Sequence, residues 1–153
     1  MKYKTHTEEF IEEFYNRLEI LTTEHLDFKT ISLKLGIYVF YWPDKSQALF
    51  LKESAYIFLN EQLTHQQLWQ DFCHELAHVL LHTGNQSHMS PLFREYQENK
   101  ANHFMYHACV PSFMLDEIEP GNLTVEYVQQ QFNVEYDFAF KRLKQYIRRE
   151  HLC

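Results

Sequence analysis

The chain has 153 residues, of which 45% are hydrophobic and 16% aromatic, so it can form one compact domain with a genuine core rather than a disordered chain. Its formal net charge of −7 argues against a dedicated nucleic-acid binder, which is usually basic because it must neutralise phosphates. The N-terminal segment is interrupted by charges, and the longest apolar run, residues 37–42, is too short to cross a bilayer. Three cysteines at wide spacing suit a reducing compartment, so we expect a cytoplasmic protein with no membrane partner.

The N-terminal third of the chain begins with two predicted helices. Apolar residues spaced three and four apart predict an amphipathic helix over residues 7–21. A shorter helix is predicted over residues 28–35. Gly36 ends it, because glycine readily adopts the left-handed conformation that closes a helix.

Three short apolar runs follow and predict strands. Residues 37–42 are rich in β-branched and aromatic side chains and stop at Pro43. Residues 48–51 and 55–59 are separated by residues 52–54, which predicts a hairpin. The three runs together predict a small sheet of about three strands.

A long helix is predicted over residues 65–82, directly after the sheet. Thr64 followed by Gln67 matches a capping box, in which each side chain bonds the other residue's backbone N–H. Gly84 supplies a C-terminal stop.

The second half of the chain is predicted to be helical throughout. Ser90 and Pro91 form an N-cap followed by proline at the first helical position, and this helix should continue to about residue 109. Two more helices are predicted over residues 123–132 and 136–151.

These elements predict an α+β fold, in which a small sheet of about three strands packs on a mainly helical domain. We expect residues 1–153 to form a single domain, with residues 121–153 as a C-terminal helical cap.

The predicted helix over residues 65–82 carries an HExxH motif formed by His74, Glu75 and His78. Residues four apart share a helix face, so both imidazoles can bind one metal ion while Glu75 reaches its rim. In catalytic zinc sites the metal lowers the pKa of a bound water to about 7, and a nearby carboxylate can then accept its proton. A chance match on a surface helix is the alternative, but apolar residues surround the motif, and burying these polar groups is costly unless they are paired or bind metal.

A third protein ligand must come from outside this motif. His82 continues the spacing, but the metzincin pattern requires a glycine at position 81 and a histidine at position 84, and both are absent. His82 is therefore interpreted either as structural or as an outer partner that supports a ligand. On the next helix Glu98 lies beside the apolar stripe, whereas Glu95 is rotated toward solvent, so Glu98 is the better candidate. Asn102 could orient a ligating histidine or be a simple surface amide.

Three parts of the sequence match a known family: residues 71–82 (DFCHELAHVLLH), residues 98–105 (ENKANHFM) and Pro111. They resemble the ImmA/IrrE family of metallopeptidases, and the likeness extends over residues 37–111. HExxH alone is moderately specific, and its pairing with ExxANxF is much more so. The family often has small residues where this chain has His103, Tyr106 and His107, which are candidates either for oxyanion stabilisation or for packing.

The resemblance implies a gluzincin-like site with one zinc ion per chain, held by His74, His78 and Glu98, with Glu75 as the general base. It also implies a protein substrate. Family members cleave or inactivate a helix-turn-helix repressor in bacteria, mobile elements and phages, so the expected function is a zinc-dependent metallo-endopeptidase that cleaves such a repressor.

Two other functions remain possible from the sequence. A non-catalytic regulator would keep the zinc site but act by binding a partner protein. A DNA-binding protein is the third interpretation, because residues 123–147 resemble a helix-turn-helix and the last helix carries Lys141, Arg142, Lys144, Arg148 and Arg149. The net acidity of the chain makes nucleic-acid binding the weakest of the three.

Overall fold

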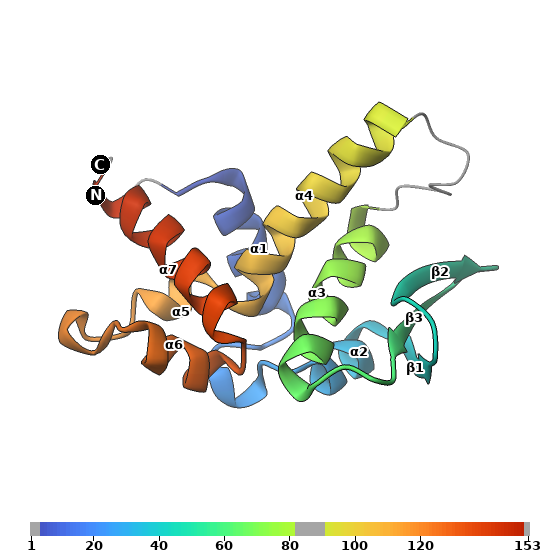
Figure 1. The fold of residues 1–153 in the computed structure, drawn as a ribbon, viewed down its shortest axis with the longest axis horizontal. Helices are drawn as coiled ribbons and strands as arrows, with labels where there is room; N and C mark the ends of the chain where they lie inside the picture. The colour runs from blue at the N-terminus through green and yellow to red at the C-terminus, as the bar shows by residue number, and fades with distance from the viewer. Residues whose placement is uncertain (1–3, 82–90, 152–153) are drawn as a thin grey trace.

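The computed structural model describes residues 4–81 and 91–151 of the chain, with side chains in the second range described for residues 98–148. Figure 1 shows a small sheet at one end and helices filling the rest of the molecule. The helices are α1 (His6–Arg17), α2 (Phe28–Leu35), α3 (His65–Leu81), α4 (Pro91–Cys109), α5 (Ser112–Leu115), α6 (Val125–Phe132) and α7 (Tyr136–His151), with short 3₁₀ helices at Thr23–His25 and Pro120–Asn122; the strands are β1 (Tyr38–Trp42), β2 (Gln47–Leu51) and β3 (Ser54–Asn60).

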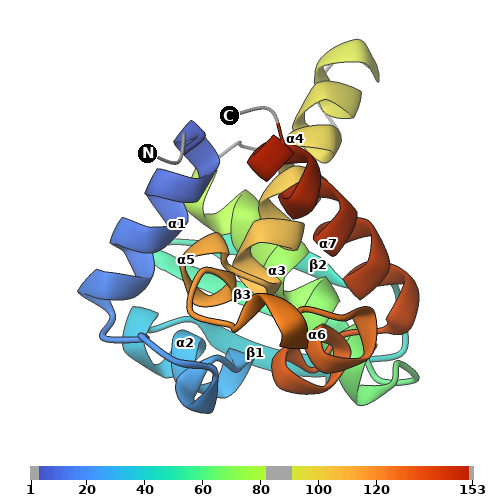
Figure 2. The ribbon, with the colours of Figure 1, turned by 90° about the vertical axis from the view of Figure 1, so that its left-hand side faces the viewer.

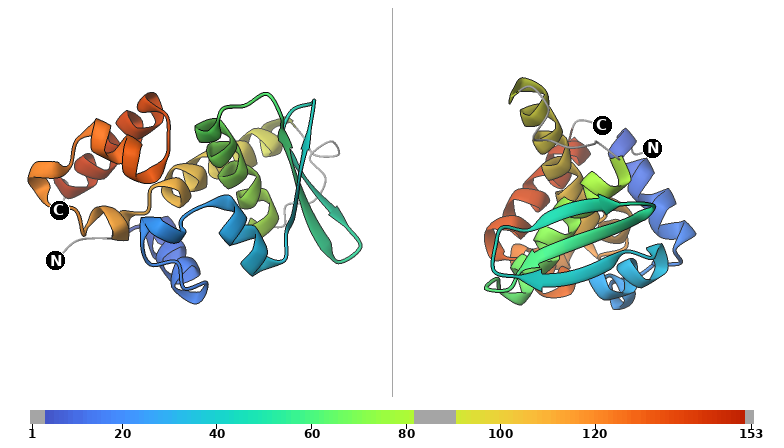
Figure 3. Two further views of the ribbon diagram at one scale, coloured as in Figure 1. Left: turned by 90° about the horizontal axis from the view of Figure 1, so that it is seen from below. Right: turned by 90° about the vertical axis from the view of Figure 1, so that its right-hand side faces the viewer.

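The three strands form a mixed sheet in the order β1-β3-β2, which confirms the predicted α+β class. β2 and β3 pair antiparallel as the predicted hairpin, whereas β1 runs parallel to β3. Side chains alternate between the two faces of a strand, so Ile57 and Leu59 share one face of β3, where both are fully buried. Helix α3 packs against this inner face (Figure 3).

Helices α3 and α4 pack against each other through small and apolar side chains. Leu76 and Ala77 of α3 and Ala101 and Ala108 of α4 are fully buried in the core. Alanine brings two helix backbones close together because its side chain is only a methyl group. This close approach brings polar residues of α3 and α4 next to each other.

The N-terminal helix is shorter than its apolar spacing predicts. A capping box between Thr5 and Glu8 starts α1, but the helix ends at Arg17 instead of residue 21. The backbone of Glu19 turns to a positive φ of 60°, and the N–H of Ile20 then donates to the carbonyl of Tyr15 at 2.8 Å. This turn places Ile20 in the core. The free energy gained by burying the Ile20 side chain therefore exceeds that of one more turn of helix. Helix α2 and its left-handed Gly36 cap match the prediction.

Helices α6 and α7 lie at the end of the molecule away from the sheet (Figures 1 and 2). Thr124 caps α6, so this helix starts two residues later than predicted, and α7 has the predicted bounds. Arg142 of α7 is buried, and it donates to the carbonyl of Val110 at 3.0 Å and to Ser112 Oγ at 2.7 Å. The C-terminal helices are therefore joined to the central helices through buried polar contacts.

Within the described ranges, no helix combines the length and apolar character needed to cross a bilayer.

Candidate metal centre

Helix α3 presents two histidines on one face, as their spacing predicts. Its first turn is closed by the predicted capping box, with Gln67 N–H donating to Thr64 Oγ1 at 3.2 Å and Thr64 N–H donating to Gln67 Oε1 at 3.0 Å. The rings of His74 and His78, one turn apart, have their centroids 5.1 Å from each other. Both side chains are largely shielded from solvent, with 17% and 10% of their surfaces exposed.

Glu98 of α4 brings a carboxylate to both histidines. Its Oε2 lies 2.9 Å from His74 Nε2, and its Oε1 lies 3.2 Å from His78 Nε2. One ligand atom from each of the three residues falls within 4.8 Å of the others. The structure thus brings together three residues from two helices, with Glu98 at least twenty positions after either histidine in the chain.

This donor set fits a zinc ion. Zinc binds imidazole nitrogen and carboxylate oxygen at about 2.0–2.2 Å, so donors around a tetrahedral ion lie about 3.4 Å apart. The separations of Glu98 from His74 and His78 are close to that value. Metal binding also needs neutral imidazoles, and burial lowers the pKa of His78, although the Glu98 carboxylate partly offsets this effect.

Glu75 lies beside the three candidate ligands and is itself almost fully buried, with 8% of its surface exposed. Burial, with a smaller contribution from the nearby Glu98 carboxylate, raises the pKa of Glu75 to about 8. A backbone hydrogen bond from Ala48 acts in the opposite direction and favours the charged form. A cation held by the neighbouring ligands would also favour the charged form, because opposite charges lower the pKa of a carboxyl group.

The backbone contact from Ala48 is a part of the site that the sequence did not reveal. Ala48 belongs to β2, which pairs with β3 on one side and forms an edge of the sheet. Backbone groups have no sequence signature, so only the packing of the sheet on α3 shows that this N–H reaches Glu75.

Other sequence candidates lie elsewhere or outside the described part of the chain. His82 falls outside the described residues, and the side chain of Glu95 is likewise not among those described. Asn102 is exposed and lines a hollow beside α7, which supports its reading as a surface amide. Tyr106 stacks on Phe138 with ring centroids 4.3 Å apart, so its contacts are those of packing between α4 and α7.

The histidines at positions 103 and 107 lie one turn apart on α4 and contact each other. The two rings lie 4.5 Å apart, and His107 Nδ1 is 3.0 Å from the carbonyl of His103. His103 borders the same hollow as Tyr106. None of these three residues is among the groups that meet at the candidate metal centre.

The structure exposes fewer of the basic residues of the last helix than the sequence predicts. Lys141, Lys144 and Arg148 are exposed, but Arg142 is buried and bonded to protein groups. A buried, hydrogen-bonded arginine cannot contact phosphates. This removes one of the cations on which the DNA-binding alternative depends.

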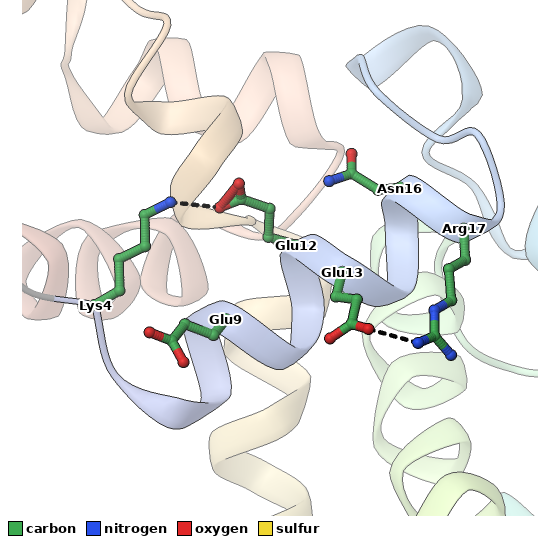
Figure 4. A pocket seen from close by; sticks show the side chains of 6 residues that line it. All are labelled: Lys4, Glu9, Glu12, Glu13, Asn16 and Arg17. Carbon is green, nitrogen blue, oxygen red and sulfur yellow. Dashed lines mark hydrogen bonds and ion pairs between the residues drawn. The ribbon is translucent and has the colours of Figure 1, made fainter.

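Helix α1 borders a separate hollow whose charges are largely paired. Figure 4 shows Lys4 beside Glu12 and Arg17 beside Glu13 along this helix. The pairs are 2.7 Å and 2.5 Å long and involve exposed side chains. Ion pairs between exposed side chains contribute little to stability. Among the described residues, the side chains that line this hollow do not form a group of metal ligands like that of His74, His78 and Glu98.

The chain is similar to a peptidase family and to two proteins of one organism. Residues 33–144 match the peptidase family described as the IrrE N-terminal-like domain. The phage-like element PBSX protein XkdA of Bacillus subtilis (strain 168) is 40% identical over 152 residues, which cover 97% of this chain and 76% of that protein. The uncharacterized protein YqaB of the same organism is 32% identical, with 99% of this chain and 92% of that protein covered.

A solved structure shares the fold. A Mycobacterium tuberculosis transcriptional regulator matches with a TM-score of 0.65 at 15% sequence identity, over 90% of this chain. The match covers 46% of that protein, so this chain spans less than half of it. At this identity the likeness concerns the fold alone.

Proposed function

Because the chain belongs to the IrrE N-terminal-like domain family of peptidases, we propose that it is a zinc-dependent metallo-endopeptidase that cleaves a regulatory protein. The observation that carries this proposal is the meeting of His74, His78 and Glu98 within 4.8 Å, with Glu75 next to them on α3. Two imidazoles, one carboxylate and an adjacent second carboxylate are the groups that hydrolysis at a zinc site requires.

Each of these residues has a separate task in the proposed reaction. His74, His78 and Glu98 would hold the ion, which when bound would supply a Lewis acid for a water molecule and for a substrate carbonyl. Glu75 accepts the proton of the attacking water and then delivers it to the leaving amine. Its burial keeps bulk water away from the transferred proton, and the Ala48 N–H orients its carboxylate.

Strand β2 offers a binding surface for the substrate backbone. It forms an edge of the sheet, and Ala48 on this strand reaches Glu75. An extended peptide can add to such an edge through backbone hydrogen bonds, which do not depend on the peptide's side chains. We propose that the substrate docks in this way, with its scissile bond near Glu75.

The proposed substrate is a helix-turn-helix repressor of a phage or mobile element. The resemblance to the ImmA/IrrE family supports this choice, as does the similarity to a protein that is named for a phage-like element. Cleavage of the repressor would release the genes that it silences. This places the proposed reaction in the cytoplasm, where a repressor acts.

The decisive experiment compares the parent chain with Glu75→Gln. Glutamine keeps the size of the side chain and removes the base, so this variant should bind zinc and the repressor normally. We expect cleavage of a repressor encoded beside the gene to fall by about a hundredfold or more, as loss of a general base usually costs. Gel electrophoresis and mass spectrometry of the products measure cleavage. Elemental analysis measures the zinc content of each variant.

The same variant separates the peptidase from a regulator that works by binding. A binding regulator would relieve repression in cells equally well with Glu75→Gln, and the repressor would remain uncut in both strains. That result would replace the peptidase proposal with the binding one.

A further inference from the structure

A ladder of stacked aromatic rings covers the outer face of the sheet. Tyr38, Phe40 and Trp42 of β1 alternate with Tyr56 and Phe58 of β3. Successive ring centroids lie 5.3, 6.4, 5.6 and 4.9 Å apart from Tyr38 to Trp42. The Trp42 indole N–H is satisfied within the chain, because it donates to the carbonyl of Lys45 at 3.0 Å.

The ladder lies on the face of the sheet opposite to helix α3. Ile57 and Leu59 point inward and are fully buried, whereas Tyr38 and Phe40 have 54% and 48% of their surfaces exposed. In the right-hand view of Figure 3, no described helix lies in front of this face. A sheet normally buries one face, and the second face of a half-exposed sheet is usually polar.

The remaining outward positions of the sheet carry no charge. The register places Gln47, Leu49 and Leu51 of β2 on the outer face together with Ser54 and Asn60 of β3. Charged residues make up 23% of the whole chain, so their complete absence from this face is a local property. Depletion of charge combined with aromatic enrichment is typical of the centre of protein–protein interfaces.

We propose that this aromatic face binds the same face of a second copy of the chain. An uncharged face does not repel its own copy, even though each molecule has a net charge of −7. It also offers no cation to a nucleic acid and no charged group to an acidic or basic partner, so it suits an equally uncharged surface such as the same face of another copy. Two copies related by a two-fold axis would pack sheet on sheet, as in a β-sandwich.

The area of the face fits a reversible dimer. A fully exposed aromatic side chain offers roughly 200 Å². At their exposures Tyr38 and Phe40 each contribute about 100 Å², and with the neighbouring apolar side chains the face offers on the order of 500 Å². Stable interfaces bury about 800 Å² per partner, so the smaller area of this face supports a weak, reversible dimer and not a permanent one.

In the proposed dimer, the candidate metal centre of each copy stays accessible. Helix α3 packs against the inner face of the sheet, so the interface and the centre lie on opposite sides of it. Dimerisation therefore does not depend on the proposed peptidase function. An experiment can contradict the proposed dimer and leave the proposed peptidase activity standing, or the reverse.

The test is sedimentation velocity on the full chain up to about 100 µM. Phe40 is the central ring of the ladder, and Phe40→Asp should raise the dimer dissociation constant at least tenfold because it places two carboxylates at the interface. Phe140→Asp on α7 is the matched control, since Phe140 is 52% exposed against 48% for Phe40. It should leave the dimer unchanged.

A charge exchange gives a sharper version of the test. Phe40→Asp and Phe40→Lys should each be monomeric alone, and their mixture should recover the dimer through an opposite pair of charges. Circular dichroism checks that the variants are folded. If Phe40→Asp does not fold, Leu51→Asp replaces it, because Leu51 is 59% exposed at the end of the same face.

Three results would overturn the proposal. The first is a parent chain that stays monomeric at the highest concentration. The second is a dimer that weakens equally in Phe40→Asp and Phe140→Asp, since the interface would then lie elsewhere. The third is a monomer whose aromatic face binds a single-stranded oligonucleotide and loses that binding in Phe40→Asp.

Discussion

His74 and His78 differ from a solvated histidine because both rings contact the carboxylate of Glu98. Two imidazoles from one helix face and a carboxylate from the next helix form the donor set on which the proposed zinc site rests.

Removal of either histidine should abolish stoichiometric zinc binding. His74→Ala and His78→Ala each take away one of three protein ligands, and two ligands do not hold the ion. His65→Ala provides the control, because His65 is exposed at the start of the same helix. Zinc content after dialysis is measured by elemental analysis; unchanged content in both ligand variants would show that the site has been wrongly assigned.

The two glutamates of α4 should behave differently. Glu98→Ala removes the carboxylate that contacts both histidines, and zinc affinity should fall by more than the roughly 10- to 100-fold that loss of an outer partner costs. Glu95→Ala should be close to neutral. Competition with a zinc chelator measures both affinities, and the reverse order would move the ligand one turn back along α4.

At the scale of helices and strands, the buried contacts of α7 decide its role. Arg142 has 1% of its surface exposed and bonds the segment that joins α4 to α5. Gln67 Nε2 and Gln70 Nε2 of α3 also donate to Glu135, at 3.2 and 2.9 Å. These contacts support the proposal that residues 121–153 cap one peptidase domain instead of forming a separate DNA-binding unit.

Arg142→Ala should destabilise the protein by about 3 kcal/mol. The substitution leaves a cavity and deprives the Val110 carbonyl and Ser112 hydroxyl of a charged donor. For a chain of this size the melting temperature should fall by roughly 6–12 °C. Lys144→Ala on the exposed side of α7 should change stability by no more than about 0.5 kcal/mol. Equal effects in thermal unfolding would argue against a structural role for Arg142.

At the scale of the whole molecule, the candidate metal centre lies between two parts of the core. His74 and His78 come from the helix that packs on the sheet, and Glu98 comes from the helix that packs on α1 and α7. An ion bound by both helices stabilises the folded state only, because the unfolded chain does not hold the three ligands together.

Removal of zinc should therefore lower the thermal stability of the parent chain. At a zinc concentration a thousandfold above the dissociation constant, binding contributes about 4 kcal/mol, which corresponds to roughly 10 °C in melting temperature. A chelator should cause this decrease in the parent chain and leave the melting temperature of His78→Ala unchanged. An equal decrease in both would point to a zinc site elsewhere in the chain.

The sequence by itself determined the features that depend on neighbouring positions. The spacing of His74 and His78, the cap formed by Thr64 and the stop at Gly36 are local, because helix geometry relates residues three or four apart. The apolar runs likewise predicted the strands to within about two residues. Glu98 could be ranked above Glu95 because the apolar stripe of α4 defines which side faces the core.

Only the tertiary structure decided what depends on residues far apart in the chain. The parallel pairing of β1 with β3, the early end of α1 and the burial of Arg142 follow from packing, in which one buried contact outweighs local preference. The contact of Glu98 with His74 and the hydrogen bond from the Ala48 N–H to Glu75 also depend on packing, because each joins residues that are far apart in the chain. Local patterns specify which groups a helix or strand carries, but the distances between groups on different elements are set by how the whole core fills space.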